Sequence, residues 1–308
     1  KWLCIPSIHF FGIMKINFFR HIAVLSGTGV GGGSLVYANT LPIPKSTFFK
    51  TGSWSQLLDW ENELAPYYRE ALRMLGAAKT PKLFDADLGL KKVAQKLHIE
   101  DKFNATNVAI YFGEENVTKK DPYFEGKGPE RTGCNYCGAC MTGCRNNSKN
   151  TLDKNYLYLA QKLGAEILAE HEVYDVRPIH EEDGTNGYEV AIKTSTKLIS
   201  KRTKIKSQGV IFSGGVLGTV KLLLKLKMSS LPNISNRLGH NIRTNNETLV
   251  SISSLDKEKN YSKGVAIGSI LDTDANSHLE VVRYSEGSNA WKFLHLPYVT
   301  GSTIFSRL

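Results

Sequence analysis

Hydrophobic residues recur at helical spacing in three stretches of the first half of the chain. From Ser55 to Leu75 apolar side chains return every three or four positions, and Gly76 stands where a helix would stop. Residues 88–97 and 151–164 show the same spacing, and the second of these stretches also ends at a glycine. The pattern predicts three amphipathic helices, with a long polar loop at 104–131 before the last of them.

Short apolar runs rich in β-branched residues indicate strands elsewhere. Strands are predicted at 21–27, 166–168, 171–179 and 188–194. A hairpin turn at 181–187 joins the last two. Residues 209–227 predict a buried strand, a double-glycine turn and a helix, a unit typical of α/β proteins. Further β-like runs follow at 248–255, 264–271 and 279–284. We therefore expect a domain boundary near residue 245, with a β-rich domain after it.

Composition sets the class of protein. With 308 residues and 41% hydrophobic content, the chain can bury one large core or two ordinary ones. A net charge of +10 suits nucleic acid, a membrane surface or a site for anionic phosphates. The densest basic run, 193–206, alternates with β-branched residues and predicts a solvated strand face, so no nucleic acid is expected as a partner.

The apolar run 2–19 is broken by polar residues and predicts no transmembrane segment. The start at Lys1, in mid-pattern, predicts a fragment.

A glycine segment is the first candidate for chemistry. Residues 27–32 fit the spacing of a dinucleotide-binding turn, but Pro42 and Pro44 end the segment before a full helix, and no acidic residue follows a second strand. Four glycines precede Ser34, at positions 29, 31, 32 and 33. They would let the backbone approach a flat or phosphorylated ligand. The alternative is a tight turn without a ligand.

A cysteine cluster is the second candidate. The spacing of Cys134, Cys137, Cys140 and Cys144 is that of cysteines that ligate iron–sulfur clusters. Against this, Arg145 rather than a proline follows the last cysteine, and no second run exists. Zinc and a metal-free loop remain open as alternatives. Cysteines packed so locally do not indicate a disulfide framework, so a cytoplasmic location is expected, with a peripheral membrane position as the alternative.

Five segments in this order resemble the glucose/methanol/choline (GMC) oxidoreductases, in particular the bacterial branch similar to cholesterol oxidase. They are "GVGGGSLVYANTLPIP", "YYREALRMLGA", "GCNYCGACMTGCRNNSKNTLDKNYLYLA", "GVIFSGGVLGTVKLLL" and "LGHNIRTNNE". The resemblance covers residues 12–284. It implies an α/β (α+β) fold: an incomplete FAD-binding domain of the glutathione-reductase-like type at 1–245, with a cysteine-rich loop at 131–147, and the start of a β-sheet substrate domain at 246–308.

The same resemblance implies the cofactor contacts. Gly32, Gly33 and Ser34 would lie nearest the flavin. The other implied contacts are Gly29, Gly31, Asn39, Val173 (near adenine), Gly214 and Gly215. Residues 37–39 are Tyr-Ala-Asn where cholesterol oxidases usually have Asn-Gly-Gly, which puts contacts from these positions in question.

The resemblance also indicates what lies elsewhere. The family's first Gly-x-Gly-x-x-Gly turn is expected before Lys1, and its catalytic histidine beyond Leu308. His240, His278 and His295 stand outside the family's motif, so no catalytic base is assigned.

The resemblance implies an FAD-dependent enzyme that oxidises the CH–OH group of an alcohol or sterol by hydride transfer to the flavin, with an electron-acceptor protein as a candidate partner. Two alternatives stay open. One is an electron-transfer module in which the four cysteines hold an iron–sulfur cluster. The other is a non-catalytic fragment.

Overall fold

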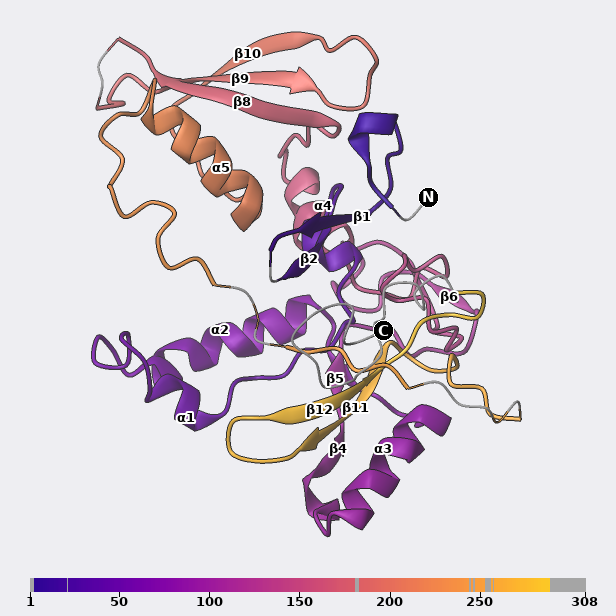
Figure 1. Cartoon of the computed structure of the whole chain (residues 1–308). Coiled ribbons are helices and arrows are strands. Elements are labelled where there is room, and N and C mark those ends of the chain that lie inside the picture. Colours follow the sequence, from indigo (N-terminus) through magenta and orange to yellow (C-terminus); the bar gives the residue numbers. More distant parts are fainter. Residues whose placement is uncertain are drawn as a thin grey trace, which may run out of the picture. The chain divides into compact units, whose positions relative to one another are not determined.

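The computed structural model describes residues 3–20, 22–180, 183–243, 245, 247–252, 256 and 258–288. Its contacts divide the chain into two compact units. The first comprises residues 1–4, 12–165 and 251–308, and the second comprises 5–11 and 166–250. Both mix helices with small sheets, as the sequence predicts (Figure 1). The division into domains at 1–245 and 246–308 stays a prediction.

The first unit begins with a hairpin that leads into the glycine segment. Strands β1 (Met14–Phe18) and β2 (Ala23–Gly27) pair antiparallel, with Met14 opposite Gly27. The predicted strand at 21–27 is therefore confirmed over the residues of β2. The glycines continue into a short 3₁₀ helix, η2 (Gly32–Leu35), and the chain then reaches helix α1 (Ser46–Phe49).

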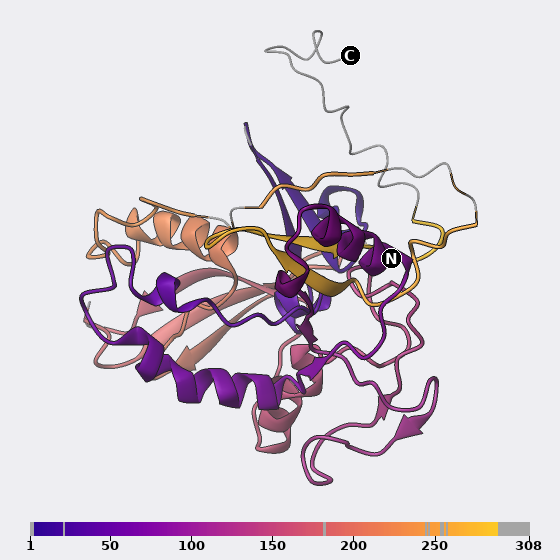
Figure 2. The same ribbon diagram turned by 90° about the horizontal axis from the view of Figure 1, so that it is seen from below.

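Two of the predicted helices form, although the first begins at Trp60 rather than at Ser55. Helix α2 (Trp60–Met74) starts at the N-cap Asp59, whose side chain accepts a hydrogen bond from the Asn62 N–H at 3.4 Å. Helix α3 (Asp85–Lys96) packs against strand β11 (Ile267–Asp272) through buried Leu90, Ala94 and Leu271 (Figure 2). Strand β11 is the centre of an antiparallel sheet with β12 (His278–Val282) and β4 (Phe103–Ala105). The predicted runs at 264–271 and 279–284 are thus strands.

The middle of the first unit is irregular, in keeping with the predicted polar loop. Its short elements are η3 (Glu100–Lys102), β3 (Ala78–Lys79), β5 (Asn107–Val108), β6 (Thr118–Lys119) and β7 (Arg131–Thr132). The single helix predicted at 151–164 is wrong: it is two pieces, η4 (Leu152–Lys154) and α4 (Tyr156–Lys162). Asn155 separates them with φ −136° and ψ −97°, and its side chain caps the second piece through the Tyr156 N–H.

The second unit is a three-stranded antiparallel sheet with a helix. Strands β8 (His171–Pro178), β9 (Tyr188–Thr194) and β10 (Arg202–Ser207) pair in the order β10-β9-β8, and α5 (Val216–Lys227) contacts β8 (Figure 1). The predicted strands at 171–179 and 188–194 are therefore confirmed, and β8 and β9 pair as the two arms of a hairpin. The remaining short element of this unit is η1 (Pro6–Ile8). Every residue of β10 is exposed, which agrees with the predicted solvated basic face.

Three strand predictions are not confirmed. Residues 166–168 and 209–213 are irregular, and Ile211 is 90% exposed. No strand in the described part of the chain runs beside 209–213, so its backbone has no ladder partner, and an apolar run alone does not make a strand. Of the run 248–255, residues 248–252 form no element, and 253–255 lie outside the described residues. None of the helices among the described residues combines the length and the apolar character needed to cross a bilayer.

Candidate cofactor-binding site

The backbone of the glycine segment takes a shape that only glycine adopts easily. Gly29, Gly31 and Gly32 have φ values of 125°, 103° and 54°, in the region where a side chain strains the backbone. At Gly27 the chain folds back so closely that an added Cβ would collide with the Gly32 carbonyl. At Gly32 and Gly33, by contrast, an added Cβ would meet no atom within 4 Å. The segment is therefore tightly folded on its inner side and open on its outer side.

The Ser34 hydroxyl holds this shape. It donates to the Gly31 carbonyl at 2.6 Å and accepts a hydrogen bond from the Leu152 N–H at 2.9 Å. An added Cβ on Gly31 would lie 3.4 Å from the Asp153 carboxylate. The start of η4 thus lies against the glycine turn. The Ser34 proton is already engaged inside the loop, so its contact with a cofactor stays a prediction.

Asn39 differs from the other nominated residues because its polar side chain is fully buried. It is fully buried with φ 72°, a left-handed conformation that asparagine tolerates better than most residues. Its carbonyl accepts the Ala109 N–H at 2.9 Å, which fixes the backbone. Its side-chain amide interacts with the buried Cys140 thiol and opposes the rise in the pKa of that thiol, but neither Nδ2 nor Oδ1 has a partner of full hydrogen-bond geometry among the described residues. A buried amide that is weakly paired is unfavourable, so this group is a candidate for a stronger partner that the chain itself does not supply.

Lys149 is a site residue that sequence reasoning missed. Its side chain is fully buried, and Nζ donates to the carbonyls of Leu35 at 3.1 Å, Tyr37 at 2.8 Å and Cys140 at 2.9 Å. The ammonium group also lies 4.7 Å from the centre of the Tyr37 ring. Burial lowers the pKa of Lys149 to about 8, and the nearby thiols of Cys140 and Cys144 oppose the shift. The only sequence signal was its position in the segment that carries the resemblance.

A second buried cation lies on the same stretch of chain. Arg131 is 1% exposed and donates to the Asn150 and Asn147 side-chain oxygens and to the Lys149 carbonyl. Burial lowers the pKa of Arg131. These bonds fix the backbone at 147–150, from which the Lys149 side chain projects. The Asp153 carboxylate adds a buried Oδ1 that has no hydrogen-bond partner among the described residues.

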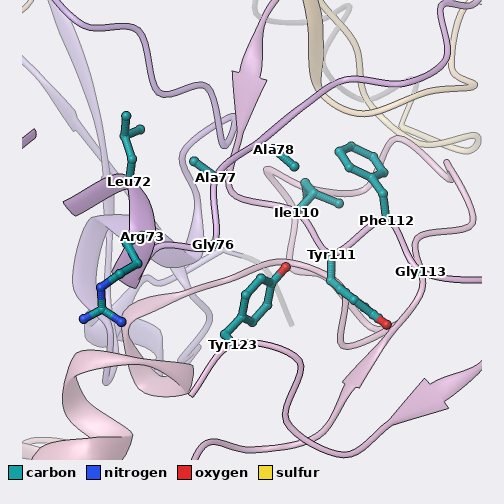
Figure 3. A pocket seen from close by; sticks show the side chains of 10 residues that line it. All are labelled: Leu72, Arg73, Gly76, Ala77, Ala78, Ile110, Tyr111, Phe112, Gly113 and Tyr123. Carbon is teal, nitrogen blue, oxygen red and sulfur yellow. The ribbon is translucent and has the colours of Figure 1, made fainter. Parts of the chain in front are cut away.

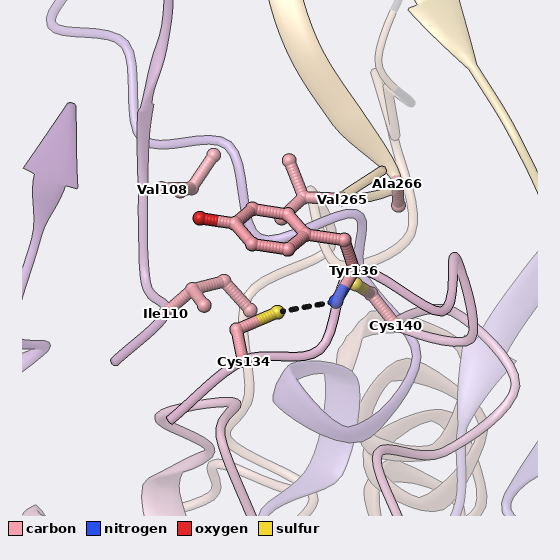
Figure 4. Close-up of a cluster of buried hydrophobic side chains, with 7 residues drawn as sticks. All are labelled: Val108, Ile110, Cys134, Tyr136, Cys140, Val265 and Ala266. Carbon is pink, nitrogen blue, oxygen red and sulfur yellow. Dashed lines mark hydrogen bonds between the residues drawn. The ribbon is translucent and has the colours of Figure 1, made fainter. Parts of the chain in front are cut away.

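The four clustered cysteines do not share one environment. Cys134 and Cys140 are buried in an apolar cluster with Val108, Ile110, Tyr136, Val265 and Ala266 (Figure 4). Cys137 is exposed and Cys144 is half-buried. The loop is held to the chain before β11 by two backbone bonds, Gly138 N–H to the Gly264 carbonyl at 2.9 Å and Gly264 N–H to the Tyr136 carbonyl at 2.8 Å.

This arrangement gives the iron–sulfur and zinc interpretations no support. Among the described residues, no three His, Cys, Asp or Glu side chains come together in a way that could hold a metal. In this apolar cluster, burial raises the pKa of Cys134 to about 12 and also raises the pKa of Cys140.

The other nominated residues belong to the second unit. Val173 lies on β8 opposite Ile192 of β9 and is exposed. Gly215, with φ 80°, is the N-cap of α5, and an added Cβ there would meet nothing within 4 Å. At Gly214 the nearest atom to such a Cβ is the Thr219 hydroxyl, at 3.7 Å. Their contacts with a cofactor stay predictions. His240 is exposed, His278 lies 3.7 Å from Glu280, and His295 lies outside the described residues.

A cavity of about 420 Å³ lies beside the end of α2, within the first unit (Figure 3). Its walls are mainly apolar and aromatic, from Leu72, Ile110, Phe112, Tyr111 and Tyr123, and the two tyrosine rings meet edge to face. Gly76 connects it to the site region, since the Gly76 carbonyl accepts from the Asn150 amide at 3.4 Å. None of the nominated cofactor residues lines this cavity.

Both units combine helices with small sheets, so the chain is an α+β protein. Its glycine segment, open on the outer side, is a candidate ligand-binding loop. A model of the GMC oxidoreductase family matches residues 17–246, which is more than half of the chain. The chain therefore belongs to the GMC oxidoreductase family.

Two groups of curated relatives agree with this. A cholesterol oxidase of Acinetobacter baumannii is 44% identical over 297 residues, which cover 94% of this chain and 53% of that protein. Cholesterol oxidases of two Mycobacterium tuberculosis strains are 40% identical over an alignment of 311 residues, which covers 98% of this chain and 53% of theirs. The chain thus spans about half the length of these relatives.

Proposed function

We propose that this chain supplies cofactor-binding parts of an FAD-dependent oxidoreductase that oxidises the CH–OH group of an alcohol of the sterol class. The observation that carries the proposal is the open outer side of the glycine segment at Gly32 and Gly33, in a chain of the GMC family. The sterol class is supported by relatives at 40–44% identity that bear the name cholesterol oxidase.

The residues fit a flavin in two respects. Backbone without side chains at positions 32 and 33 lets a flat ring system come within contact distance. The buried Asn39 amide supplies a donor and an acceptor that have only a weak interaction with the Cys140 thiol and no partner of full hydrogen-bond geometry among the described residues. When bound, FAD would supply a hydride acceptor for the carbinol carbon.

The chain's own residues would act by binding and orientation. Gly29 and Gly31 give the turn its curvature, and Ser34 keeps it closed. We extend the proposal to the second unit, where Val173 would lie near the adenine and Gly214 and Gly215 near the cofactor at the start of α5. The glutathione-reductase-like form of the domain belongs to the same proposal. So do an electron-acceptor protein as partner and a reducing, cytoplasmic location, which the five free cysteines suit.

The test has two parts. The full-length protein, reconstituted with FAD, is expected to show flavin absorption near 450 nm and to bleach under anaerobic conditions when a 3β-hydroxysterol is added. Simple primary alcohols serve as the comparison and are expected to reduce the flavin more slowly. A protein that binds no flavin would contradict the cofactor assignment. Equal rates for sterols and primary alcohols would contradict the substrate class only.

A further inference from the structure

We propose that Lys149 is a positioning residue for the flavin: by binding three backbone carbonyls it holds residues 32–39 in the shape that receives the cofactor. This inference rests on the proposed function. Lys149 lies far from the glycine segment in sequence and was not among the nominated residues, so the contacts of the structure alone assign it this role.

The first argument is the geometry of the three bonds. The Leu35 and Tyr37 carbonyls lie at the end of η2 and just beyond it, directly after the open glycines, and the Cys140 carbonyl lies on the cysteine-rich loop. An ammonium group has three hydrogens, and each finds one carbonyl. The lysine therefore joins the exit of the glycine segment to a loop that is itself bonded to the chain before β11.

The second argument is that residues just after Lys149 also contact the glycine segment, nearer to its beginning. The Leu152 N–H donates to the Ser34 hydroxyl, and Asp153 lies against Gly31. Residues 149–153 thus contact the glycine segment before, within and after η2. Arg131 fixes the backbone from which this stretch starts, through Asn150 and the Lys149 carbonyl. The glycine segment has backbone hydrogen bonds of its own between residues 29 and 37, and residues 149–153 add contacts from outside the segment.

The third argument concerns energy. Burying an ammonium group without a carboxylate partner is unfavourable, and no salt bridge to Lys149 occurs among the described residues. Carbonyl bonds and the Tyr37 ring, at 4.7 Å, compensate only in part. The unfavourable burial of the Lys149 ammonium group is explained if ligand binding needs the backbone shape that this side chain enforces.

The test is cofactor affinity in the full-length protein, measured on folded apoprotein by quenching of FAD fluorescence. K149M removes all three donors, and we expect FAD to bind at least about tenfold more weakly, as the loss of one or more backbone-fixing bonds implies. K149R keeps a cation and several donors and is expected to recover part of the affinity. The visible circular dichroism of bound flavin should change in K149M, because the ring would lie in an altered chiral surrounding.

Two controls separate positioning from plain destabilisation. V265A loosens the same apolar cluster that holds Cys140, but a valine side chain has no hydrogen-bond donor for any of the three carbonyls. It is expected to lower stability while leaving the FAD affinity of the folded protein within about twofold. K82M removes an exposed lysine that also lies over aromatic rings, and no change is expected.

Three outcomes decide the matter. If folded K149M binds FAD as wild type does, with unchanged dichroism, the positioning role is wrong while the proposed function stands. If V265A weakens FAD binding as much as K149M at equal stability, Lys149 is only structural, and the inference is likewise wrong. If wild-type protein binds no FAD, the proposed function itself fails and takes the inference with it. Should K149M not fold, K149Q carries the test, because it keeps a polar side chain but loses the ammonium group and at least one of the three donors. Wild-type affinity and dichroism in folded K149Q would count against the inference.

Discussion

Arg283 and Asp87 form an ion pair inside the first unit, with Nη2 2.7 Å from Oδ1 and side chains only 2% and 0% exposed. The other ion pairs among the described residues are considerably more exposed. Asp87 also accepts the Phe84 N–H at 3.0 Å and the Ser269 hydroxyl at 2.8 Å. One carboxylate thus ties the start of α3 to β11 and to the residue that follows β12.

Removing the arginine should leave a buried, unpaired charge. We expect R283M to lower the free energy of unfolding by about 3–5 kcal/mol, measured by urea denaturation. D85N is the matched control, because Asp85 lies two residues away and contacts Lys259 at 3.7 Å on the surface. Its effect should stay below about 1 kcal/mol. Similar losses in both variants would show that burial does not set the importance of this pair.

The open side of the glycine segment can be tested without disturbing the fold. G33A adds a methyl group where no atom lies within 4 Å and where φ is not positive, so apoprotein stability should change by less than about 0.5 kcal/mol. FAD affinity should nevertheless fall, because the methyl group would stand between backbone and cofactor. G209A, at another exposed glycine with free space around it, is the control and should leave both quantities unchanged. Unaltered FAD binding in G33A would contradict the proposal that the cofactor binds on this side of the segment.

Buried titratable groups should give the apoprotein an unusual dependence on pH. Burial lowers the pKa of Lys149 from 10.5 to about 8, so above pH 8 the unfolded chain holds a proton that the folded chain has released. Stability should therefore rise between pH 8 and 9, by up to about 1.4 kcal/mol per pH unit. Above pH 9 the effect is opposed, because the Cys134 thiol, with its pKa raised from 9.0 to about 12, keeps its proton only in the folded state.

Urea denaturation at half-unit steps from pH 7 to 10 checks this dependence. K149M should lose the rise and keep the later fall. C134A should keep the rise and weaken the fall. A wild-type protein whose stability falls steadily from pH 7 would contradict the lowered pKa of Lys149.

The cysteines should differ sharply in reactivity. Cys137 is exposed, whereas Cys134 and Cys140 are buried and burial raises the pKa of both thiols. Because the thiolate is the reactive form, a disulfide reagent should modify Cys137 first in the native protein and reach Cys134 and Cys140 only on unfolding. C137S should remove the fast phase and serves as the control. Native protein purified without oxygen in which all four clustered thiols resist modification, with iron and sulfide bound, would restore the iron–sulfur interpretation.

Elements that depend on residues close together in sequence could be predicted, whereas elements that need partners from distant parts of the chain could not. Helices α2 and α3 and the pairing of β8 with β9 depend on periodicity and on turns between neighbours in sequence, and they were predicted from the chain alone. The run at 209–213 reads as a strand but finds no partner among the described residues, and a strand exists only through its ladder. Asn155 divides the helix expected at 151–164, because its side-chain oxygen accepts the Tyr156 N–H and so caps a new helix. Composition alone does not predict this break.

The site divides in the same way. Glycines 29 and 31 were nominated from spacing, and their positive φ values agree with a special turn. The burial of Lys149 and Arg131 could not be read from the sequence, since a lysine or arginine is expected at the surface and only the folding of distant segments encloses it. The burial of the Asn39 amide could not be predicted for the same reason.

The bonds of Lys149 also bear on which positions can vary. Lys149 recognises carbonyl oxygens, which every amino acid carries, so the identities of residues 35, 37 and 140 are not fixed by this contact. A change of backbone-compatible residues at 35 or 140 therefore leaves these carbonyl acceptors in place. Mutational tolerance should differ between the two partners: aromatic residues that keep a ring beside the ammonium group should be accepted at position 37, whereas few substitutions should be accepted at Lys149.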